Sequence, residues 1–529
     1  MKTVEEFIKK STGRNPDELD NGKYSPFKIL ETVKDVLFEA KKNNDTVCII
    51  GDYDVDGIMS MIILVLIMIT KGIKYVLIVP KRFSEGYGTS EKMFDRIPEN
   101  CILITIDNGI SADFSVIRNK VKRIVVLDHH SLDEGMDMPD ADIIVDPSAI
   151  EGQCDFRHFC GAGIAFRLAM IMDMPELVLK KINALAAMAT VADCVEMLDD
   201  NRIIVREGLV YLNSPETRIS GLNYLVRGLG LIDGNIDVKA IGFKLAPCIN
   251  AAGRMVDDGA KIVISALLSN KAIGVCVMLK LNDERKKLSE IVLNSVEMND
   301  EDSINVNIID AVSGTKWSVF GLLGIIAGQI AEKTKKPTIV IAKDVNSGLY
   351  KGSGRSVGDF NIYKALSTLK DELSQFGGHP EAAGLQLEES NLKKFKADIN
   401  DIAKKTVITF SEPECIEVED VSQEHIENLR LEVLKYGPYG AKNAEPEFLL
   451  NETLVENGKK ETFSVYNKDT KSCLIRLNCF DGITAIGFQD TYKDFVKKGF
   501  PKQIQIKGKI DGNYYMGKTT PQIAISSIV

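Results

Sequence analysis

The sequence predicts an α/β fold whose first part is built on a parallel sheet. Short runs rich in valine, isoleucine and leucine recur before residue 150, and none alternates strictly between apolar and polar positions. Such runs are typical of strands that are covered on both faces. Helical patterns separate several of them, the clearest over residues 58–70, and this alternation indicates βαβ units. The expected strands are residues 47–50, 75–79, 102–106, 124–127 and 142–145.

The rest of the chain predicts three further parts. Apolar residues recur at helical spacing over residues 272–298, which indicates a long connecting helix. A strand pattern resumes at residues 305–340, with an amphipathic helix over 321–334. Beyond about residue 410, short alternating segments predict a small β-barrel, specifically an OB-fold. We therefore expect residues 1–271 as a first domain with an N-terminal helical extension, residues 272–300 as a connecting helix, residues 301–408 as a second domain, and residues 409–529 as the barrel.

Length and composition exclude several classes of protein. With 529 residues, 45% hydrophobic and 26% charged, the chain is typical of a soluble globular protein. The longest apolar block, residues 61–69, is far shorter than the roughly 20 residues that cross a bilayer, and the polar N-terminus shows no signal region. Ten cysteines without a C-x-x-C pair predict reduced thiols in the cytoplasm and no structural zinc. The net charge of −10 does not favour a nucleic-acid partner, so such a partner has to be inferred from locally positive patches.

Acidic residues and two histidines follow the predicted strands at the points where these strands end. The stretch GDYDVDG, residues 51–57, comes directly after the first strand, and acidic residues also follow three later strands. One acidic turn alone would be an ordinary solvated loop. Because ligands bind beyond the carboxyl ends of the strands in open α/β sheets, we instead expect these residues to meet in one metal site. They are Asp52, Asp54, Asp56, Asp107, Asp128, His129, His130 and Asp146.

The ligand types predict the metal and the reaction. Carboxylates with imidazole and no thiolate suit Mn²⁺ well and Mg²⁺ less well, with Zn²⁺ and Fe²⁺ as competitors. Several anionic ligands carry more charge than one divalent ion neutralises, which predicts two ions ~3.5–4 Å apart. Two-metal sites typically serve the hydrolysis of phosphate esters. We therefore expect a phosphodiester or a phosphoanhydride as the substrate.

Several motifs together resemble those of one family. GDYDVDG, TIDNG, LDHH and VADCV resemble the four motifs of the DHH phosphoesterases. GSGRS at residues 352–356 and FGGHPEAAG at residues 376–384 resemble the associated DHHA1 substrate-binding domain. NAAGRM at residues 250–255, followed by LNDERK at residues 281–286, is similar to the RecJ-type single-strand-specific exonucleases. The resemblance implies a DHH domain before the connecting helix, a DHHA1 domain after it, and an OB-fold that binds nucleic acid.

The resemblance also implies roles for individual residues. The implied metal ligands are Asp54, Asp56, Asp107, His129 and Asp193, with Asp107 as a bridge between ions. His130 would face the scissile phosphate, and Asp128 would orient the neighbouring imidazole, so that these two residues and Asp107 form the catalytic set. Two roles stay open for Asp52: it is either a metal ligand or a residue that stabilises the turn.

Three positions depart from the family pattern. Ile50 stands where pyrophosphatase relatives have a histidine, which argues against that branch. Glu196 stands where proline is more frequent, and Gly354 stands where alanine is common. We expect neither of the latter two to abolish activity, although Glu196 would add negative charge close to the site.

Substrate choice is expected to depend on cationic side chains and backbone donors. Guanidinium groups and the N–H groups of glycine-containing loops hold phosphates together. A surface salt bridge is the alternative for each arginine, and a core position is the alternative for the histidine. The expected substrate-binding residues are Arg82, Arg254, Ser353, Arg355, Gly378 and His379. Of these, Arg82, Ser353 and Arg355 are expected to form a pocket for a 5′-phosphate.

Lysines and aromatic residues gather near the C-terminus. Cations contact the phosphates of a single strand and rings stack on its bases, so this composition predicts a nucleic-acid-binding surface. A solvated lysine face over core aromatic residues is the alternative. The residues are Lys493, Lys497, Lys498, Lys502, Lys507, Lys509 and Lys518, with Tyr492, Phe495, Phe500, Tyr514 and Tyr515.

Three functions compete. The resemblance implies a 5′-to-3′ exonuclease that uses two Mn²⁺ ions, or Mg²⁺, to hydrolyse single-stranded DNA to mononucleotides in DNA repair and recombination. One alternative is a DHH phosphodiesterase acting on cyclic dinucleotides or short oligonucleotides, which usually lacks the barrel. The other is a non-catalytic replication scaffold, which would have lost metal ligands. We expect the exonuclease, acting as a monomer, with single-stranded DNA and a single-stranded-DNA-binding protein or helicase as partners, and no membrane.

Overall fold

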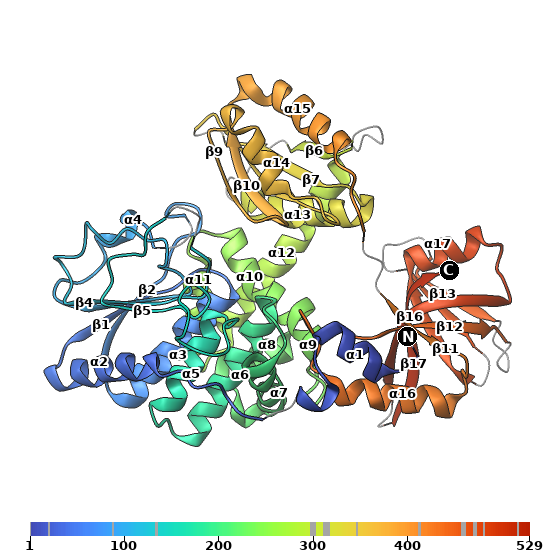
Figure 1. Cartoon of the computed structure of the whole chain (residues 1–529), viewed down its shortest axis with the longest axis horizontal. Coiled ribbons are helices and arrows are strands. Elements are labelled where there is room, and N and C mark those ends of the chain that lie inside the picture. The colour runs from blue at the N-terminus through green and yellow to red at the C-terminus, as the bar shows by residue number, and fades with distance from the viewer. Residues whose placement is uncertain are drawn as a thin grey trace. The chain divides into compact units, whose positions relative to one another are not determined.

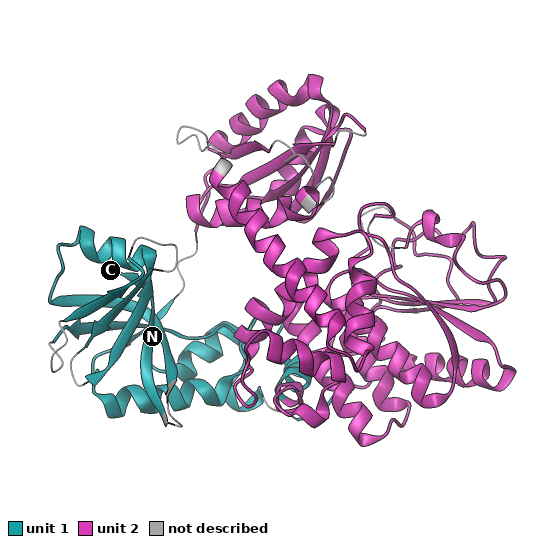
Figure 2. Cartoon of the chain, turned by 180° about the vertical axis from the view of Figure 1, so that it is seen from behind, with its two compact units in different colours: residues 1–25, 194–206, 412–529 teal, residues 26–193, 207–411 magenta. Residues whose placement is uncertain are grey.

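The structure is a computed structural model of the chain, and its described part divides into two compact units (Figure 2). The larger unit comprises Pro26–Asp193 and Glu207–Ser411, and the C-terminal unit comprises Met1–Ser25, Cys194–Arg206 and Glu412–Val529. The described residues are 2–19, 22–86, 89–132, 136–296, 303–309, 318–344, 347–410, 414–455, 462–468, 473–479, 482–515 and 518–529.

The first sheet of the larger unit confirms the predicted parallel sheet. Its order is β2-β1-β3-β4-β5, and all neighbouring strands are parallel. β1, β3 and β4 are almost completely buried, which explains why their sequences lack alternation. The edge strand β2 is largely exposed. The bounds are β1 Thr46–Ile50, β2 Lys74–Ile78, β3 Ile102–Ile106, β4 Arg123–Leu127 and β5 Ile143–Val145.

Helices surround this sheet and extend beyond it (Figure 1). Helix α3, Val55–Lys71, is buried along most of its length because it packs against α5 and α6, and it contains the apolar block at residues 61–69. None of the described helices combines the length and the apolar character that crossing a bilayer requires. The other helices are α2 Ile29–Asn43, α4 Glu91–Phe94, α5 Gly161–Ile171, α6 Glu176–Ala192, α7 Asp199–Leu212, α8 Ser220–Gly228, α9 Val238–Ala240, α10 Ala246–Met255 and α11 Gly259–Leu268.

Helix α12, Ile273–Ser295, is the predicted connecting helix, and it leads to a second sheet. Residues 297–300, which we included in this helix, lie outside the described residues. The second sheet has the order β6-β7-β8-β10-β9, in which only β6 and β7 are parallel. Leu288 and Val292 of α12 share a buried cluster with residues of α13. The bounds are β6 Asn305–Ile309, α13 Ser318–Thr334, β7 Thr338–Lys343, β8 Tyr350–Arg355, α14 Ile362–Thr368, β9 Gln375–Gly378, β10 Ala382–Leu387 and α15 Leu392–Lys405.

The C-terminal unit contains a sheet of order β11-β12-β16-β17-β15-β14-β13. The prediction of a β-rich domain is confirmed, and among the described residues its sheet is not closed into a barrel. Among the described residues, the end strands β11 and β13 do not pair, and a single bridge between Leu454 and Cys479 links the β12 and β14 sides. Both end strands are four residues long, which is too short for a ladder across a barrel. The bounds are β11 Cys415–Val418, α16 Gln423–Tyr436, β12 Glu447–Thr453, β13 Phe463–Tyr466, β14 Leu474–Asn478, β15 Thr484–Phe488, α17 Gln489–Lys497, β16 Gln503–Tyr515 and β17 Lys518–Ile528.

The N-terminal helix packs in the C-terminal unit, whereas the sequence analysis attached it to the first domain. Val4, Phe7 and Ile8 of α1, Val4–Thr12, belong to the same buried cluster as residues of the seven-stranded sheet. Leu198 joins this cluster from the segment Cys194–Arg206. The amphipathic pattern of α1 predicts a buried face but does not specify its partner. The expected domain boundaries stay a prediction.

Candidate active site

The loop after β1 leads straight into α3 and presents carboxylates at the start of this helix. Asp54 is the N-cap residue of α3, and its Oδ1 accepts a hydrogen bond from the Gly57 N–H at 3.1 Å. Asp56 lies in the first helical turn and is buried. The first N–H groups of a helix have no intrahelical acceptor and favour negative charge. The helix start therefore stabilises the acidic residues that follow β1.

A second helix start holds Asp56. Its Oδ2 accepts a hydrogen bond from the Gly161 N–H at 2.6 Å, and its Oδ1 accepts one from the Ala162 N–H at 2.8 Å. A Cβ atom on Gly161 would lie 2.8 Å from the Cβ of Asp107, so this close approach requires glycine. Neither Gly161 nor Ala162 was predicted from the sequence, because a backbone donor carries no side-chain signal.

The structure brings the five predicted metal ligands together at the carboxyl ends of the strands. His129 Nε2 lies 3.0 Å from Asp107 Oδ1, 3.6 Å from Asp56 Oδ2 and 3.8 Å from Asp193 Oδ2. Asp107 follows β3, and Asp193 is the C-cap residue of α6. Among the described residues, three groups have ligand atoms within 4.8 Å of one another: Asp52, Asp54 and Asp107; Asp56, His129 and Asp193; Asp107, His129 and His130.

The charges in this cluster are poorly compensated by the protein alone. Burial, with the charges of Asp56 and Asp54, raises the pKa of Asp107 well above its usual value. Burial and the same two neighbours raise the pKa of Asp193 to about 8. Asp52 is buried, and its Oδ1 has no hydrogen-bond partner among the described residues. Buried carboxylates that repel one another in this way fit a site for divalent cations.

His130 has a different hydrogen-bond partner from His129. Its Nδ1–H donates to Asp128 Oδ1 at 2.7 Å, and Asp128 Oδ2 accepts from the Ile110 N–H at 2.9 Å. Although burial alone would lower it, this hydrogen bond and the charge of Asp128 raise the pKa of His130 to about 9. The imidazole that Asp128 orients is therefore that of His130.

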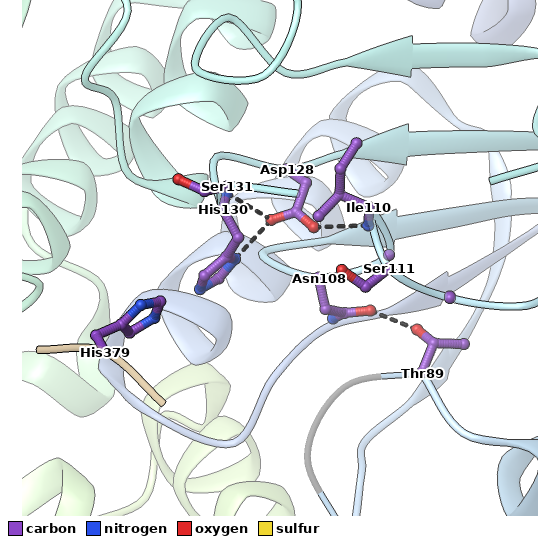
Figure 3. Close-up of a pocket in the computed structure, with 10 residues that line it drawn as sticks. Thr89, Asn108, Ile110, Ser111, Asp128, His130, Ser131 and His379 are labelled. Atoms are coloured by element: carbon purple, nitrogen blue, oxygen red, sulfur yellow. Dashed lines mark hydrogen bonds and ion pairs between the residues drawn. The ribbon is translucent and has the colours of Figure 1, made fainter. Parts of the chain in front are cut away.

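The His130 ring faces a cavity of about 330 Å³ (Figure 3). Asp128, Ser131 and Asn108 line the cavity from the first sheet, and His379 lines it from the second. This position favours a ligand-facing role for His379 over the core alternative. Gly378 is absent from the lining; its φ of +138° and a Cβ that would lie 2.4 Å from the Ala382 carbonyl oxygen give it a backbone role in the β9–β10 turn.

Four guanidinium groups gather near this cluster. Burial, followed by the charges of Arg82, Arg285 and Arg355, lowers the pKa of Arg254 to about 10. Arg82 lies over the Tyr53 ring at 4.5 Å from its centroid, and Arg254 Nη1 donates to the Gly321 carbonyl at 3.1 Å. In the described part of the chain, none of these four arginines forms an ion pair with a carboxylate. The surface salt bridge that we considered for Arg82, Arg254 and Arg355 is therefore not found.

Ser353 and Arg355 lie together on β8. Arg355 Nη1 donates to Ser353 Oγ at 2.9 Å and to the Gly354 carbonyl at 2.8 Å. Alanine at Gly354 would bring a Cβ atom to 2.5 Å from Ile362 Cδ1, which would have to move. Arg285 donates to Asn282 Oδ1 from Nε and Nη2. Arg285 lies in the LNDERK motif but was not predicted as a site residue, because only the fold brings it near Arg254.

The comparisons with known proteins agree with this arrangement. A family model described as the DHH family, N-terminal domain, matches residues 46–192, and the DHHA1 domain model matches residues 318–405. The chain therefore contains a DHH domain and a DHHA1 domain. The single-stranded-DNA-specific exonuclease RecJ of Bacillus subtilis strain 168 is 30% identical over 523 residues, which make up 95% of this chain and 64% of that protein. The chain thus spans less than two thirds of that relative.

Two solved structures of RecJ proteins are also similar. RecJ in complex with Mn²⁺ from Thermus thermophilus has a TM-score of 0.79 at 24% identity, over 99% of this chain and 75% of that one. A structure of exonuclease RecJ bound to manganese has a TM-score of 0.60 at 28% identity, over 72% of this chain and 96% of that one. The resemblance of this DHH/DHHA1 chain to RecJ-type members is confirmed.

In the C-terminal unit, several residues of the predicted nucleic-acid-binding surface pack in the core or form ion pairs. Phe495 is buried in the core and contacts the Phe463 and Phe500 rings. Lys507 lies 3.6 Å from Glu447, and Lys509 lies 2.8 Å from Glu445, as ion pairs. The alternative of a lysine face over core aromatic residues therefore holds for these positions. Glu196 belongs to this unit and forms a bridge with Ala441.

Proposed function

We propose that this protein is a divalent-metal-dependent exonuclease that hydrolyses single-stranded DNA from the 5′ end to mononucleotides. One observation carries the proposal: Asp107 belongs to two ligand groups, one with Asp52 and Asp54 and one with His129 and His130, and His130 lines a cavity. A shared carboxylate between two sets of ligands is the arrangement of two-metal phosphoesterases. The similarity to RecJ of Bacillus subtilis, whose name states a single-stranded-DNA-specific exonuclease, supports the substrate.

Each group at the site has a task in this reaction. Asp54, Asp56, Asp107, His129 and Asp193 would hold two Mn²⁺ ions, or Mg²⁺, with Asp107 as the bridge. Such ions supply a hydroxide nucleophile and neutralise charge on the phosphoryl oxygens. The protonated imidazole of His130, which Asp128 holds in place, donates a hydrogen bond to an oxygen of the scissile phosphate. The charge of this donor matches the charge that gathers on that oxygen.

The arginines would select the end of the strand. Arg82, Ser353 and Arg355 would bind a 5′-phosphate, while Arg254 and the cavity side of His379 would contact the next part of the strand. Because the guanidinium groups carry no carboxylate partner in the described residues, their donors are available to phosphates.

Replacement of Arg355 tests this selection. Arg355→Ala should lower kcat/KM on a 5′-phosphorylated oligonucleotide by about 10- to 100-fold, as expected for loss of a charge-assisted contact. The same variant should change kcat/KM on a 5′-hydroxyl oligonucleotide much less. Arg118→Ala, which removes an exposed ion pair with Asp142, is the matched control. Equal losses on both substrates would contradict a role in binding the 5′-phosphate.

A time course with one oligonucleotide tests the reaction itself. The oligonucleotide is labelled at the 5′ end or the 3′ end in separate reactions with Mn²⁺, beside its duplex and a cyclic dinucleotide. We expect the 5′ label to appear at once as a mononucleotide, the 3′-labelled strand to shorten stepwise, and the duplex to persist. Consumption of the cyclic dinucleotide alone would favour the phosphodiesterase, and no cleavage of any substrate would favour the scaffold.

The remaining expectations belong to the same proposal. A role in DNA repair and recombination and a cytoplasmic location follow from a substrate of single-stranded DNA. A single-stranded-DNA-binding protein or a helicase as partner, and a monomeric state, stay predictions. Light scattering of the purified chain, with and without an oligonucleotide, measures the oligomeric state directly.

A further inference from the structure

Arg82, one of the three residues expected to bind a 5′-phosphate, lies on a short turn after β2. The Glu85 N–H donates to the Lys81 carbonyl at 3.0 Å, and the Lys81 N–H donates to Glu85 Oε2 at 2.8 Å. Residues 81–85 therefore form one closed turn. The Arg82 guanidinium lies over the Tyr53 ring, 4.5 Å from its centroid. Because a single turn of backbone is unstable by itself, this turn needs support from another segment to hold Arg82 in place.

Asp257 supplies this support from the segment between α10 and α11. Its Oδ1 accepts hydrogen bonds from the Phe83 N–H at 2.8 Å and the Ser84 N–H at 3.1 Å. Its Oδ2 accepts a third from the Ser84 hydroxyl at 2.6 Å. Successive N–H groups of a turn form a concavity that binds anions, and the Asp257 carboxylate occupies this one. We call these three hydrogen bonds the Asp257 clamp. They fix the backbone that directly follows Arg82.

The segment that carries Asp257 is itself tied to the surroundings of Arg82. Arg254 lies three residues before Asp257, in the last turn of α10. The charge of Arg82 contributes to the lowered pKa of Arg254, so the two guanidinium groups lie near each other. A Cβ atom on Gly253 would lie 3.3 Å from the Tyr53 carbonyl oxygen, so α10 also passes close to the loop that carries the Tyr53 ring. The clamp thus fixes the turn of Arg82 to the helix that presents Arg254.

We propose that Asp257 is a positioning residue that holds the turn of residues 81–85 so that Arg82 faces the 5′-phosphate of the substrate. The proposal rests on the proposed function and adds a residue that acts through Arg82. The three donors occupy the carboxylate, and the Arg82 guanidinium stays available to a phosphate. A displacement of ~1 Å in a binding group can cost on the order of 100-fold in rate, so loss of the clamp should weaken recognition of the 5′ end.

Asp257→Ala tests this role. Release of the first nucleotide is measured with Mn²⁺ on one single-stranded oligonucleotide that carries either a 5′-phosphate or a 5′-hydroxyl. The variant should raise KM for the phosphorylated strand about tenfold and change kcat less than about twofold, because the metal ligands are untouched. KM for the hydroxyl strand should stay nearly constant. A purely structural role would affect both strands equally, and equal losses would overturn the proposal.

A double variant identifies the residue through which Asp257 acts. Arg82→Ala removes the guanidinium that the clamp positions, so adding Asp257→Ala to this variant should raise KM no further. An equal rise in KM with and without the Arg82 side chain would show that Asp257 acts elsewhere and would overturn the proposal.

Conservative and neighbouring variants complete the comparison. Asp257→Asn keeps an oxygen for the two N–H groups and an amide that can donate to the Ser84 hydroxyl, so it should keep the preference for a 5′-phosphate. A loss as large as that of Asp257→Ala would contradict a role through these hydrogen bonds. Asp258→Ala removes the next carboxylate, which is exposed and lies 3.9 Å from Lys81 Nζ, and should leave both KM values unchanged.

A surface variant keeps the proposal testable if Asp257→Ala does not fold. Ser84→Ala removes one hydrogen bond of the clamp from an exposed side chain. It should lower the preference for the phosphorylated strand by about threefold, as expected for one hydrogen bond. An unchanged preference in this variant would overturn the proposal.

The wild type separates this proposal from the proposed function. If the wild type hydrolyses single-stranded DNA equally well with either 5′ end, the exonuclease stands and the role of Asp257 is wrong. If it hydrolyses no single-stranded DNA, the proposed function fails, and fluorescence anisotropy in EDTA with the same two oligonucleotides decides the role of Asp257. Tighter binding of the phosphorylated strand that Asp257→Ala abolishes would support the clamp. A preference that persists in the variant, or none in the wild type, would overturn it.

Discussion

Asp107 occupies the most crowded position of the candidate site. It belongs to two of the three ligand groups, and burial together with neighbouring aspartates raises its pKa. Asp107→Asn keeps the shape of the side chain, and asparagine tolerates the φ of +59° found there. The variant should raise the melting temperature in EDTA, because it removes a buried carboxyl group whose ionised form is disfavoured by burial and by the neighbouring aspartates.

The same variant should lose its response to metal. At a Mn²⁺ concentration ~100 times the dissociation constant, binding would add about 2.7 kcal/mol to the stability of the wild type, and Asp107→Asn should show little of this gain. Asp113→Asn, on an exposed loop, is the matched control and should behave as the wild type in both conditions. A full Mn²⁺-induced shift in the Asp107→Asn variant would contradict the assignment of this residue.

Residues differ in how well the sequence predicts them. Asp54, Asp107 and His129 follow apolar strands, and the parallel order of these strands is enough to bring them together. Arg285 lies on α12, and its approach to Arg254 depends on how α10 and α12 pack. Tertiary packing of this kind leaves no local pattern in the sequence. The clustering of residues at strand ends is therefore predictable from the sequence, whereas that of residues on packed helices is not.

At the scale of elements, the start of α5 is the clearest link between packing and chemistry. Gly161→Ala would place a Cβ atom 2.8 Å from the Cβ of Asp107 and 3.0 Å from Ser60 Oγ. Neither neighbour has room to move in this buried region, so α5 should shift and weaken its hydrogen bonds to Asp56. We expect at least a tenfold loss of Mn²⁺ affinity, measured by calorimetry. This is comparable to the effect of losing a hydrogen bond that orients a metal ligand.

The control for this substitution is another helical glycine. Gly242→Ala places its Cβ in open space, with no atom within 4 Å, and should leave Mn²⁺ affinity unchanged. If Gly161→Ala bound Mn²⁺ as the wild type does, the close approach between α5 and Asp107 would not matter for the site.

Strand β12 contains an element-scale feature of a different kind. Glu452 is 2% exposed, and neither of its carboxylate oxygens has a hydrogen-bond partner among the described residues. Burial raises the pKa of Glu452 to about 7. The pKa of Glu452 is therefore higher in the folded state than in the unfolded state. The contribution of this residue to stability is fully present below the unfolded-state pKa and declines as the pH rises to about 7.

Glu452→Gln should remove this decline. The wild type should lose on the order of 3 kcal/mol of stability between about pH 4.5 and pH 7 through this residue, while the glutamine variant should lose much less over the same range. Thermal melting followed by circular dichroism at several pH values measures the difference. Glu447→Gln, on the same strand and partly exposed, is the control. Parallel pH profiles for the wild type and the Glu452→Gln variant would show that Glu452 does not titrate in this range.

At the scale of the whole molecule, the sequence order of segments is a poor guide to their packing. The strands of the first sheet were predictable because each carries its own apolar run. The position of α1 was not, because an amphipathic helix of nine residues fits any apolar surface. Closure of the barrel was not predictable, because the spacing of strands predicts their existence and not whether the end strands β11 and β13 pair; among the described residues they do not.

This organisation predicts the result of truncation. A chain that ends at residue 411 keeps α1 but loses the sheet against which Val4, Phe7 and Ile8 are buried. It should bind a hydrophobic dye and aggregate, because an apolar helix face is left in water. A chain of residues 26–411 lacks α1 and should aggregate less. Both chains keep Asp54, Asp107 and Asp193 in the larger unit, so Mn²⁺ should still raise the melting temperature of whatever remains monomeric. Equal dye binding and equal solubility of the two chains would show that α1 does not depend on the C-terminal sheet.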